Sequence, residues 1–374
     1  MTKSSEVAVV GGGIIGSAIA YYLAKAGHQV ELLEAGKVGS GSTQAAAGML
    51  GAHSEFKEFG ASLYSFARTS QEMYEEAETD IRSLTGIDIE RRTGGLMQLV
   101  FNEEEKEMLL SQFSSLKGVT WLDCPTVTKK MPGLSKSVLG AFHMAEDVHV
   151  TPEIACRGFH TAASMLGARI NAYTSVDEIV KESDHYRLRT SKGEWQAERV
   201  VIASGVWSNA LLQRSGLGTP IFPVKGECIA VTNTQTPLTC SLFHDQHYIV
   251  PRNNNELIIG ATKVKNDWST EPTLGGLQTI VEKARKMLPE VDKMPFLRSW
   301  AGLRPQTSDG KPLIGEHPKM KGLFIAAGHQ RNGILLAPAT GKMICDLIGS
   351  NVVPEEWKEA FRVDRLNTGE EVLM

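Results

Sequence analysis

Apolar and polar positions near the N-terminus follow a strand pattern first and a helix pattern next. The run Val7–Val10 is apolar, three glycines follow it, and Ile14–Lys25 is helix-like. A second apolar run, Gln29–Leu33, ends at Glu34. The pattern predicts a strand, a tight turn, a helix and a second strand, which is how an α/β fold with a parallel sheet begins.

The middle of the chain alternates helical and strand-like segments. Helices are predicted over residues 54–85, 102–116, 153–166 and 274–287. Strands are predicted within residues 88–100, 140–149, 199–205, 224–231, 248–251 and 256–261, with a hairpin turn over 191–196. The strand patterns between Ile221 and Leu303 predict a second, mainly antiparallel sheet inserted between segments of the first domain.

The C-terminal part repeats the strand, loop and helix order of the N-terminus. Gly322–Gly328 reads as a buried strand, His329–Ala337 as a loop, and Pro338 as the start of a helix that ends at Ile348. We therefore predict a Rossmann-like domain assembled from discontinuous segments, and an α+β substrate domain. The first comprises residues 1–88, 150–220 and 300–374, and the second comprises residues 89–149 and 221–299.

Composition narrows the class of protein. The 374 residues carry a net charge of -4 without runs of like charge, which argues against a nucleic-acid binder. The five cysteines are scattered without a CxxC pair, which argues against a disulfide framework and against a metal site. Residues 1–6 lead directly into a strand, so neither a signal peptide nor a membrane span is expected and a cytoplasmic location is predicted.

The glycines after the first strand carry the clearest chemistry. Gly11 permits a tight turn, Gly13 lets backbone approach a pyrophosphate, and Gly16 lets the helix pack against the strand. Glu34 ends the second strand, where a carboxylate can accept both hydroxyls of a ribose and would repel a 2′-phosphate. An ordinary glycine-rich turn is the alternative. The motif favours an adenine dinucleotide, and by itself it leaves NAD and FAD open.

The C-terminal unit favours FAD over NAD. An NAD site is usually completed within one contiguous nucleotide domain, whereas a second helix N-terminus from the far end of the chain suits a longer ligand with an electron-rich ring. The small residues of 36–48, with the hydroxyls of Ser42 and Thr43, can lie against the cofactor. Ala203–Gly205 is either a further cofactor contact or an ordinary tight turn.

Three side chains are candidates for binding a substrate carboxylate. Arg304 lies in the apolar, strand-like stretch Trp300–Pro305, where a guanidinium needs an anionic partner. That partner is either a substrate carboxylate or an acidic side chain of the protein. Arg331 lies in a glycine-flanked loop, and Tyr248 is either a ligand contact or a half-buried strand residue.

Several long motifs resemble those of the D-amino-acid oxidase-like FAD-dependent oxidoreductases, and within that family those of the bacterial glycine oxidases. They are VGGGIIGSAIAYYLA (10–24), STQAAAGMLGAH (42–53), IASGVWS (202–208), PVKGEC (223–228), WAGLRP (300–305), DGKPLIG (309–315) and GHQRNGILLAPATG (328–341). The resemblance covers nearly the whole chain. It implies the α/β FAD-binding fold. It also implies non-covalent FAD, since no cysteine occurs over 300–310, where the related monomeric sarcosine oxidases attach their flavin covalently.

The resemblance also implies which residues contact the cofactor. The adenosine and pyrophosphate would be held by Ile14, Ile15, Glu34 and Ala35, and the backbone of Val176, ending a strand, would meet adenine. The flavin side would be lined by Ser42, Thr43, Ala47, Gly48 and Met49. The ring would be wrapped by His329, Gln330, Arg331, Asn332, Gly333, Ile334 and Leu335. Arg304, Arg331 and Tyr248 would face the substrate.

The reaction implied by the resemblance is oxidation of glycine, or of a small amine such as sarcosine or D-alanine. Hydride would pass from Cα of the neutral amine to flavin N5, and O2 would then give hydrogen peroxide, with glyoxylate and ammonia as the other products. No side-chain acid or base is required. A role in thiamine thiazole biosynthesis and a homotetramer are implied as well, with no nucleic acid, membrane or metal as partner.

Two departures from the family pattern leave the substrate open. Gln246 replaces an expected histidine, with His247 beside it, and Lys263 replaces an expected methionine. Either change can alter which amines are accepted. The histidines of 244–247 could also form a metal site, although surface polar residues are the commoner explanation. A dehydrogenase that passes electrons to a quinone or a partner, and a flavin-binding subunit without turnover, remain alternatives.

Overall fold

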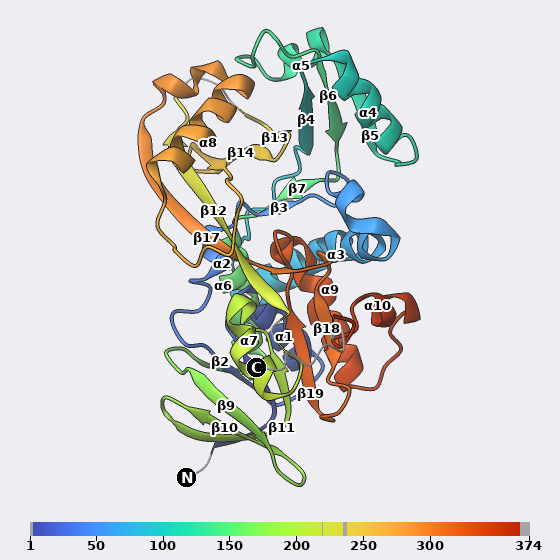
Figure 1. The fold of residues 1–374 in the computed structure, drawn as a ribbon, viewed down its shortest axis with the longest axis vertical. Coiled ribbons are helices and arrows are strands. Elements are labelled where there is room, and N and C mark those ends of the chain that lie inside the picture. The colour runs from blue at the N-terminus through green and yellow to red at the C-terminus, as the bar shows by residue number, and fades with distance from the viewer. Residues whose placement is uncertain (1–2, 219, 235–237, 367–374) are drawn as a thin grey trace, which may run out of the picture.

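The computed structural model describes residues 3–218, 220–234 and 238–366. Two large sheets lie in opposite halves of the molecule, the first in the lower half of Figure 1 and the second in the upper half. A two-stranded sheet of β3 (Met49–Leu50) and β7 (Val148–His149) lies between them. The predicted mixed α/β fold with a mainly antiparallel second sheet is confirmed. Among the described residues, no helix is both long and apolar enough to cross a bilayer.

The first sheet has a parallel centre, because its strands are buried apolar runs connected through helices. Its central order is β18-β19-β11-β1-β2-β8, in which only β18 runs antiparallel to its neighbour, and β10 and β9 extend it beside β11. The strands are β1 (Lys3–Val10), β2 (Val30–Leu33), β8 (Arg169–Asn171), β9 (Val176–Lys181), β10 (Tyr186–Thr190), β11 (Gly193–Ile202), β18 (Leu313–Glu316) and β19 (Leu323–Ala327).

The second sheet is antiparallel except where β13 pairs with β4. Its order is β16-β12-β15-β14-β13-β4-β6-β5, and β17 pairs with the other edge of β12 along almost its whole length. The strands are β4 (Leu96–Val100), β5 (Val119–Asp123), β6 (Gly140–Met144), β12 (Ile221–Thr232), β13 (Ser241–His244), β14 (His247–Pro251), β15 (Glu256–Gly260), β16 (Val264–Lys265) and β17 (Phe296–Thr307).

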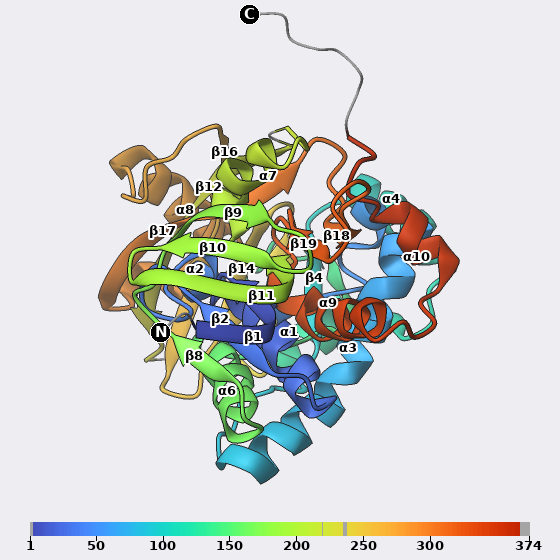
Figure 2. The ribbon, with the colours of Figure 1, turned by 90° about the horizontal axis from the view of Figure 1, so that it is seen from below.

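Helices α1, α3, α6 and α9 pack on one another and cover one face of the first sheet (Figure 2). The helices are α1 (Ile14–Lys25), α2 (Ser42–Ala45), α3 (Phe56–Thr85), α4 (Glu103–Phe113), α5 (Cys124–Lys130), α6 (Pro152–Met165), α7 (Ser208–Arg214), α8 (Leu274–Met287), α9 (Gly333–Ile348) and α10 (Glu355–Ala360). Short 3₁₀ helices span Gly205–Trp207 and Pro289–Lys293.

Helix α9 begins earlier than the sequence predicted. It starts at Gly333, so Pro338 lies inside the helix and does not start it. A proline there cannot donate to the carbonyl four residues earlier. The hydroxyl of Tyr74 on α3 donates to that carbonyl, Ile334 O, at 2.5 Å. A contact from another helix therefore satisfies the carbonyl that the proline leaves free, and local sequence rules could not foresee it.

Three other predicted boundaries differ from the structure. The hairpin turn is shorter than 191–196, because Gly193 already belongs to β11. Val176 begins β9 and does not end a strand. The predicted domain boundary between residues 299 and 300 falls inside β17, whose hydrogen bonds to β12 keep the whole strand in the second sheet. In each case the cross-strand pairing sets the boundary, and that pairing is not visible in local composition.

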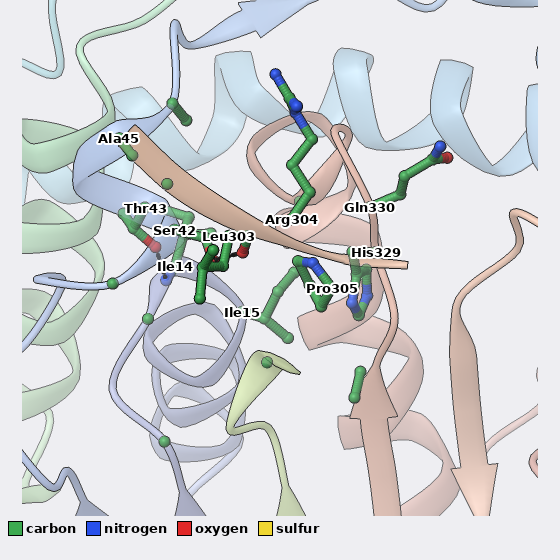
Figure 3. A pocket seen from close by; sticks show the side chains of 18 of the residues that line it. Ile14, Ile15, Ser42, Thr43, Ala45, Leu303, Arg304, Pro305, His329 and Gln330 are labelled. Carbon is green, nitrogen blue, oxygen red and sulfur yellow. Dashed lines mark hydrogen bonds between the residues drawn. The ribbon is translucent and has the colours of Figure 1, made fainter. Parts of the chain in front are cut away.

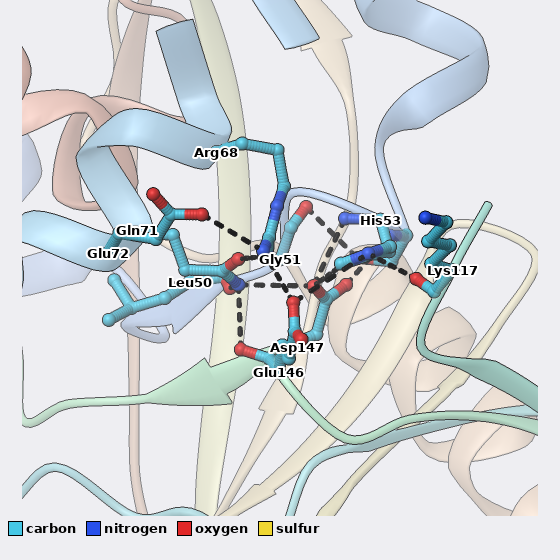
Figure 4. A network of polar contacts seen from close by, with 10 residues as sticks. Leu50, Gly51, His53, Arg68, Gln71, Glu72, Lys117, Glu146 and Asp147 are labelled. Carbon is cyan, nitrogen blue, oxygen red and sulfur yellow. Dashed lines mark hydrogen bonds and ion pairs between the residues drawn. The ribbon is translucent and has the colours of Figure 1, made fainter. Parts of the chain in front are cut away.

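A buried polar network fixes the segment that follows β3 (Figure 4). Asp147, only 1% exposed, accepts hydrogen bonds from the backbone N–H groups of His53 at 3.0 Å and Ser54 at 2.7 Å. Its carboxylate also contacts the His53 ring, and Gln71 on α3 donates to it. Arg68, one turn earlier on α3, pairs with Glu146 at 2.5 Å. The network ties segment 51–55 to α3 and to the turn before β7.

Replacement of Gly341 by alanine should destabilise the protein, because α9 lies against α1 at this point. A Cβ on Gly341 would lie 2.6 Å from the Tyr22 ring and 2.9 Å from the backbone of Ala18. Overpacking of this kind costs about 1–3 kcal/mol. We expect a lower thermal midpoint for Gly341→Ala by scanning calorimetry. Gly275→Ala in α8 is the control, since a Cβ there meets nothing within 4 Å; equal midpoints for the two variants would contradict the packing argument.

Replacement of Asp147 by alanine should also lower stability. It leaves the buried N–H groups of His53 and Ser54 without their acceptor, at a cost of about 1–3 kcal/mol for each group. The thermal midpoint should fall by about 5 °C or more. Asp184→Ala is the control, because that side chain is 85% exposed. A midpoint for Asp147→Ala that equals the control's would show that the network does not hold the segment.

Candidate active site

A cavity of about 800 Å³ is lined by segments from both sheets and from the loops between them (Figure 3). Its volume is within the usual range for sites of small molecules and cofactors. One end is formed by β1, the start of α1 and the end of β2, and the other end by β12, β14 and β17. The cavity therefore brings together the N-terminal glycine motif, the strand, loop and helix of residues 322–348, and the second sheet.

The glycine motif has the tight packing that its spacing predicted. Gly11 has φ +109°, and a Cβ on it would lie 2.5 Å from the carbonyl oxygen of Ala203. A Cβ on Gly16 would lie 1.9 Å from the carbonyl oxygen of Gly11, so α1 can pack this closely against β1 only with glycine there. The N-cap of α1, Gly13, has no side-chain cap and lines the cavity. The positive end of the helix dipole therefore faces the cavity.

Glu34 lies at the same end of the cavity as the glycines. One carboxylate oxygen accepts from the backbone N–H of Gly12 at 2.6 Å, and the other from that of Gly36 at 2.8 Å. These two bonds fix the carboxylate, and lone pairs of both oxygens remain for further donors. The arrangement suits the two hydroxyls of a ribose.

Helix α2 joins the glycine end to β17. The hydroxyl of Thr43 accepts from the backbone N–H of Ile14 at 2.9 Å, and the hydroxyl of Ser42 donates to Leu303 O at 2.5 Å. Trp300 donates its indole N–H to Ala45 O at 3.1 Å. A Cβ on Gly302 would lie 2.3 Å from the Cβ of Ala45, so the strand can pass this close to α2 only with glycine there. Figure 3 shows the Ser42–Leu303 contact beside the start of α1.

The N-terminus of α9 also faces the cavity. Its N-cap Asn332 makes no side-chain cap, and Asn332, Gly333 and Ile334 line the wall. His329 is buried and contacts the hydroxyl of Thr340 at 3.1 Å, and burial lowers the pKa of its imidazole to about 3. His329 is therefore neutral at physiological pH. This helix end presents positive dipole charge without a titrating cation.

Arg304 reaches into the other end of the cavity. Figure 3 shows its side chain on the opposite side of β17 from Leu303 and Pro305. Its guanidinium donates to Thr262 O at 3.1 Å, and it makes no ion pair with any described residue. A Cβ on Gly226 would lie 2.3 Å from the guanidinium, so glycine makes room for it. The carboxylate that Arg304 needs is not supplied by the described part of the chain.

Buried polar groups hold Thr262 in place. Glu227, 2% exposed, accepts from the hydroxyl of Thr262 at 3.0 Å and from the backbone N–H of Thr273 at 2.7 Å. The ammonium of Lys225 lies 3.5 Å from Glu227, and both side chains are fully buried. Burial raises the pKa of the Glu227 carboxyl. The hydrogen bonds and the Lys225 charge outweigh burial, so the pKa lies below its ordinary value. The Thr262 carbonyl that accepts from Arg304 is thus rigidly placed.

Tyr248 lines the same end of the cavity. Its hydroxyl lies 3.4 Å from the sulfur of Cys228, which is a weak partner, and no stronger partner is found among the described residues. Burial raises the pKa of the Tyr248 phenol well above its usual range, so the hydroxyl keeps its proton. The phenol can therefore donate to an anion bound at Arg304.

Arg331, predicted to face the substrate, forms an ion pair with Glu55. Both residues line the cavity, and Glu55 is only 6% exposed. Burial raises the pKa of the Glu55 carboxyl above its ordinary value, and the neighbouring Arg331 offsets only part of that rise. Glu55 is not among the residues predicted from the sequence, because nothing in segment 51–55 distinguishes this glutamate from a surface residue. The charge of Arg331 is thus balanced within the protein, whereas that of Arg304 is not.

Most of the predicted site residues line the cavity. Gly16 and Leu335 do not: Gly16 packs against Gly11, and Leu335 is fully buried in the core behind the wall. Ala203–Gly205, Gln246 and Lys263 line the cavity too, whereas His247 does not. The cavity wall includes Gly11, Gly13, Ile14, Ile15, Glu34, Ala35, Ser42, Thr43, Ala47, Gly48, Met49, Val176, Tyr248, Arg304, His329, Gln330, Arg331, Asn332, Gly333 and Ile334.

The residues present fit FAD. The N-termini of α1 and α9, whose N-cap residues supply no side-chain cap, face one continuous cavity from opposite ends of the chain. The first suits a pyrophosphate, with Glu34 placed for a ribose, and the second suits an electron-rich ring. An NAD site needs only the first.

Comparison with known proteins agrees with this geometry. Residues 6–347 match the family of FAD dependent oxidoreductases (DAO). The chain is 47% identical to glycine oxidase of Bacillus licheniformis over 98% of both chains. It is 33% identical to the bifunctional protein ThiO/ThiG of Synechocystis, covering 93% of this chain and 52% of that protein. The crystal structure of glycine oxidase from Geobacillus kaustophilus superimposes with a TM-score of 0.93 at 38% identity, covering 97% of this chain and 99% of that one. The chain therefore belongs to the FAD-dependent oxidoreductase family and, within it, groups with the glycine oxidases.

Proposed function

We propose that this FAD-dependent oxidoreductase oxidises glycine, and also small amines such as sarcosine and D-alanine. The single observation that carries the proposal is Arg304, a cavity guanidinium without an acidic partner among the described residues. A carboxylate matches its planar donor fork. The relatives named glycine oxidase support glycine as the carrier of that carboxylate.

The binding residues follow from the contacts of this end of the cavity. Arg304 binds the carboxylate of the amino acid, and Tyr248 donates its phenolic hydrogen to the same group. Arg331 is balanced by Glu55 and adds little net charge. Gly226 leaves the space that the guanidinium occupies. The substrate is therefore oriented by one charged contact and one neutral contact at its carboxylate.

FAD, when bound, supplies the two-electron oxidant for the Cα–H bond of the amine, and O2 is the final acceptor. The balanced reaction converts glycine, O2 and water to glyoxylate, ammonia and hydrogen peroxide. The lone pair of the neutral amine drives loss of hydride, so the chain needs only to bind and orient the substrate. His329 is neutral and buried and bonds to Thr340, which fits a structural role for it.

We also propose how FAD is held and in what setting the protein works. Non-covalent binding is supported by the lack of cysteine in residues 300–310, and the residues predicted from the family motifs line the cavity, with the exception of Leu335. A supply of product to thiamine thiazole biosynthesis is supported by the match to one part of a ThiO/ThiG protein. A cytoplasmic homo-oligomer, most simply a tetramer, follows from the family resemblance alone.

Replacement of Arg304 by alanine should raise the KM for glycine by about a hundredfold, because a hydrogen-bonded charge pair contributes about 1.5–3 kcal/mol. The measurement is initial-rate peroxide release, paired with anaerobic bleaching of the flavin by glycine. Arg298→Ala is the control: this arginine lies on the same strand but is 52% exposed and pairs with Glu256. An unchanged KM in Arg304→Ala, or a flavin that glycine does not bleach in the unaltered protein, would overturn the proposed function.

Replacement of Gly226 by alanine should act on the same contact without removing the guanidinium. The added Cβ would lie 2.3–2.4 Å from atoms of the Arg304 side chain, so the guanidinium must move. Because displacement of a positioning group costs about tenfold or more, we expect a KM for glycine raised by at least that factor. Steady-state kinetics checks this, with the flavin content measured in parallel. A normal KM at full flavin content would show that Arg304 is not confined by Gly226.

A further inference from the structure

Behind the cavity wall, Arg252 carries a positive charge that no acidic side chain contacts. This residue directly follows β14, and its guanidinium donates to two backbone carbonyls, Ala47 O at 2.7 Å and Val150 O at 2.9 Å. It forms no ion pair with any described residue, and it does not line the cavity itself. Burial lowers the pKa of the guanidinium below its ordinary value, yet an arginine keeps its proton in a protein. A largely enclosed charge is therefore left without a counter-charge in contact with it.

Three acidic side chains act on Arg252 only from a distance. The charges of Glu90, Glu153 and Glu256 raise the pKa of its guanidinium, but none of the three forms an ion pair with it. Glu256 pairs instead with Arg298 at 2.8 Å. Because an enclosed charge is costly without a partner, the position of Arg252 suits an anion that the described part of the chain does not supply.

The contact with Ala47 turns a backbone donor toward the cavity. Ala47 and Gly48 both line the cavity, and the peptide group between them is trans, so its C=O and N–H point in opposite directions. Since the C=O is turned to Arg252 behind the wall, the N–H of Gly48 is turned to the cavity, and no described residue accepts from it. Gly48 has φ +82°, and a Cβ on it would lie 2.1 Å from Val150 O, so only glycine fits here. Arg252 and Gly48 together fix the orientation of this peptide group.

We propose that Arg252 raises the reduction potential of the bound flavin, through its charge and through the peptide group that it holds against the ring. The inference rests on the proposed function, because it takes the ring to lie beside Ala47–Met49. Hydride transfer from Cα brings two electrons and one proton to the ring, which leaves the reduced ring with one negative charge. A positive charge one peptide group away stabilises that anion more than the neutral oxidised ring, and it also polarises the N–H that donates to the ring. Arg252 is thus a positioning residue, which touches neither substrate nor cofactor.

The reduction potential can be measured without substrate. The FAD-loaded protein is reduced stepwise beside a reference dye of known potential, and Arg252→Gln is compared with Arg252→Lys. Glutamine keeps a donor for Ala47 O but loses the charge, so reduced FAD should bind about tenfold more weakly relative to oxidised FAD, which lowers the potential by about 30 mV for a two-electron couple. Lysine keeps the charge, so the potential of Arg252→Lys should lie close to that of the unaltered protein. Arg252→Met, with the same expected fall, replaces Arg252→Gln if the glutamine variant does not retain FAD.

Sulfite gives a second measurement on the oxidised protein, because it adds reversibly to a flavin ring and leaves the ring anionic. Its Kd should rise about tenfold in Arg252→Gln and little in Arg252→Lys, for the same electrostatic reason.

Ser241→Ala is the structural control for both measurements. The Ser241 hydroxyl lies 3.2 Å from the ring of His149, the neighbour of Val150, and His149 also contacts Pro251 O at 2.9 Å. Burial lowers the pKa of this imidazole to about 3, so the contact is between neutral groups. The control therefore loosens the same junction without removing a charge, and its potential and sulfite Kd should stay unchanged.

An unchanged potential in Arg252→Gln overturns the inference even if the thermal midpoint falls, because a structural role alone would lower only stability. An equal loss of potential in Arg252→Gln and Arg252→Lys, or the same loss in Ser241→Ala, also overturns it, since geometry and not charge would then be responsible.

Failure of this inference can be distinguished from failure of the proposed function. If glycine bleaches the flavin and Arg252→Gln keeps the potential of the unaltered protein, only the role of Arg252 is wrong. If glycine does not bleach the flavin, glycine oxidation is wrong, and the dye measurement still reports the effect of Arg252 because it needs no substrate.

Discussion

The close approach of β17 to α2 is the contact on which the site depends. Gly302 lacks the Cβ that would collide with Ala45, and the hydrogen bonds from Ser42 to Leu303 and from Trp300 to Ala45 O hold the two elements together. On one side, α2 supports the start of α1 through Thr43. On the other side, β17 carries Arg304. The contact between α2 and β17 therefore sets the distance between the nucleotide end of the cavity and its substrate end.

Most of the charged groups that line the cavity have partners within the protein. Glu34 is fixed by backbone donors, Arg331 is balanced by Glu55, and His329 is kept neutral by burial. Because a buried charge is costly without a partner, each of these groups is satisfied within the chain. Arg304 is the exception among the described residues that line the substrate end. An unbalanced guanidinium in a cavity is what an anionic substrate recognises, so the protein leaves free the charge that it uses.

Polar contacts outside the cavity wall keep this arrangement rigid. Asp147 anchors the segment that carries Glu55, and Glu227 anchors the residue that accepts from Arg304 (Figure 4 shows the first of these). Both carboxylates are buried and accept several hydrogen bonds, and buried networks that are fully satisfied specify one geometry. Residues that do not line the cavity thus determine where the groups that bind the substrate lie.

The sequence by itself determined the local parts of this protein. Glycine spacing predicted the turn at Gly11 and the packing at Gly16, and periodicity predicted α1 and α8 with the bounds that the structure has. The position of Arg304 in an apolar, strand-like stretch indicated that its guanidinium binds an anion. These signals succeed because each depends on neighbours in the chain, as backbone conformation and helix patterning do.

Only the tertiary structure decided which distant groups meet. The partner of Arg331 lies on a loop 276 residues away, and the hydroxyl that replaces the bond lost at Pro338 comes from another helix. The assignment of all of β17 to the second sheet likewise depends on its pairing with β12. Ion pairs and strand partners are determined by proximity in space and by the cost of leaving a buried polar group unsatisfied. Local sequence predicts neither the proximity nor that cost.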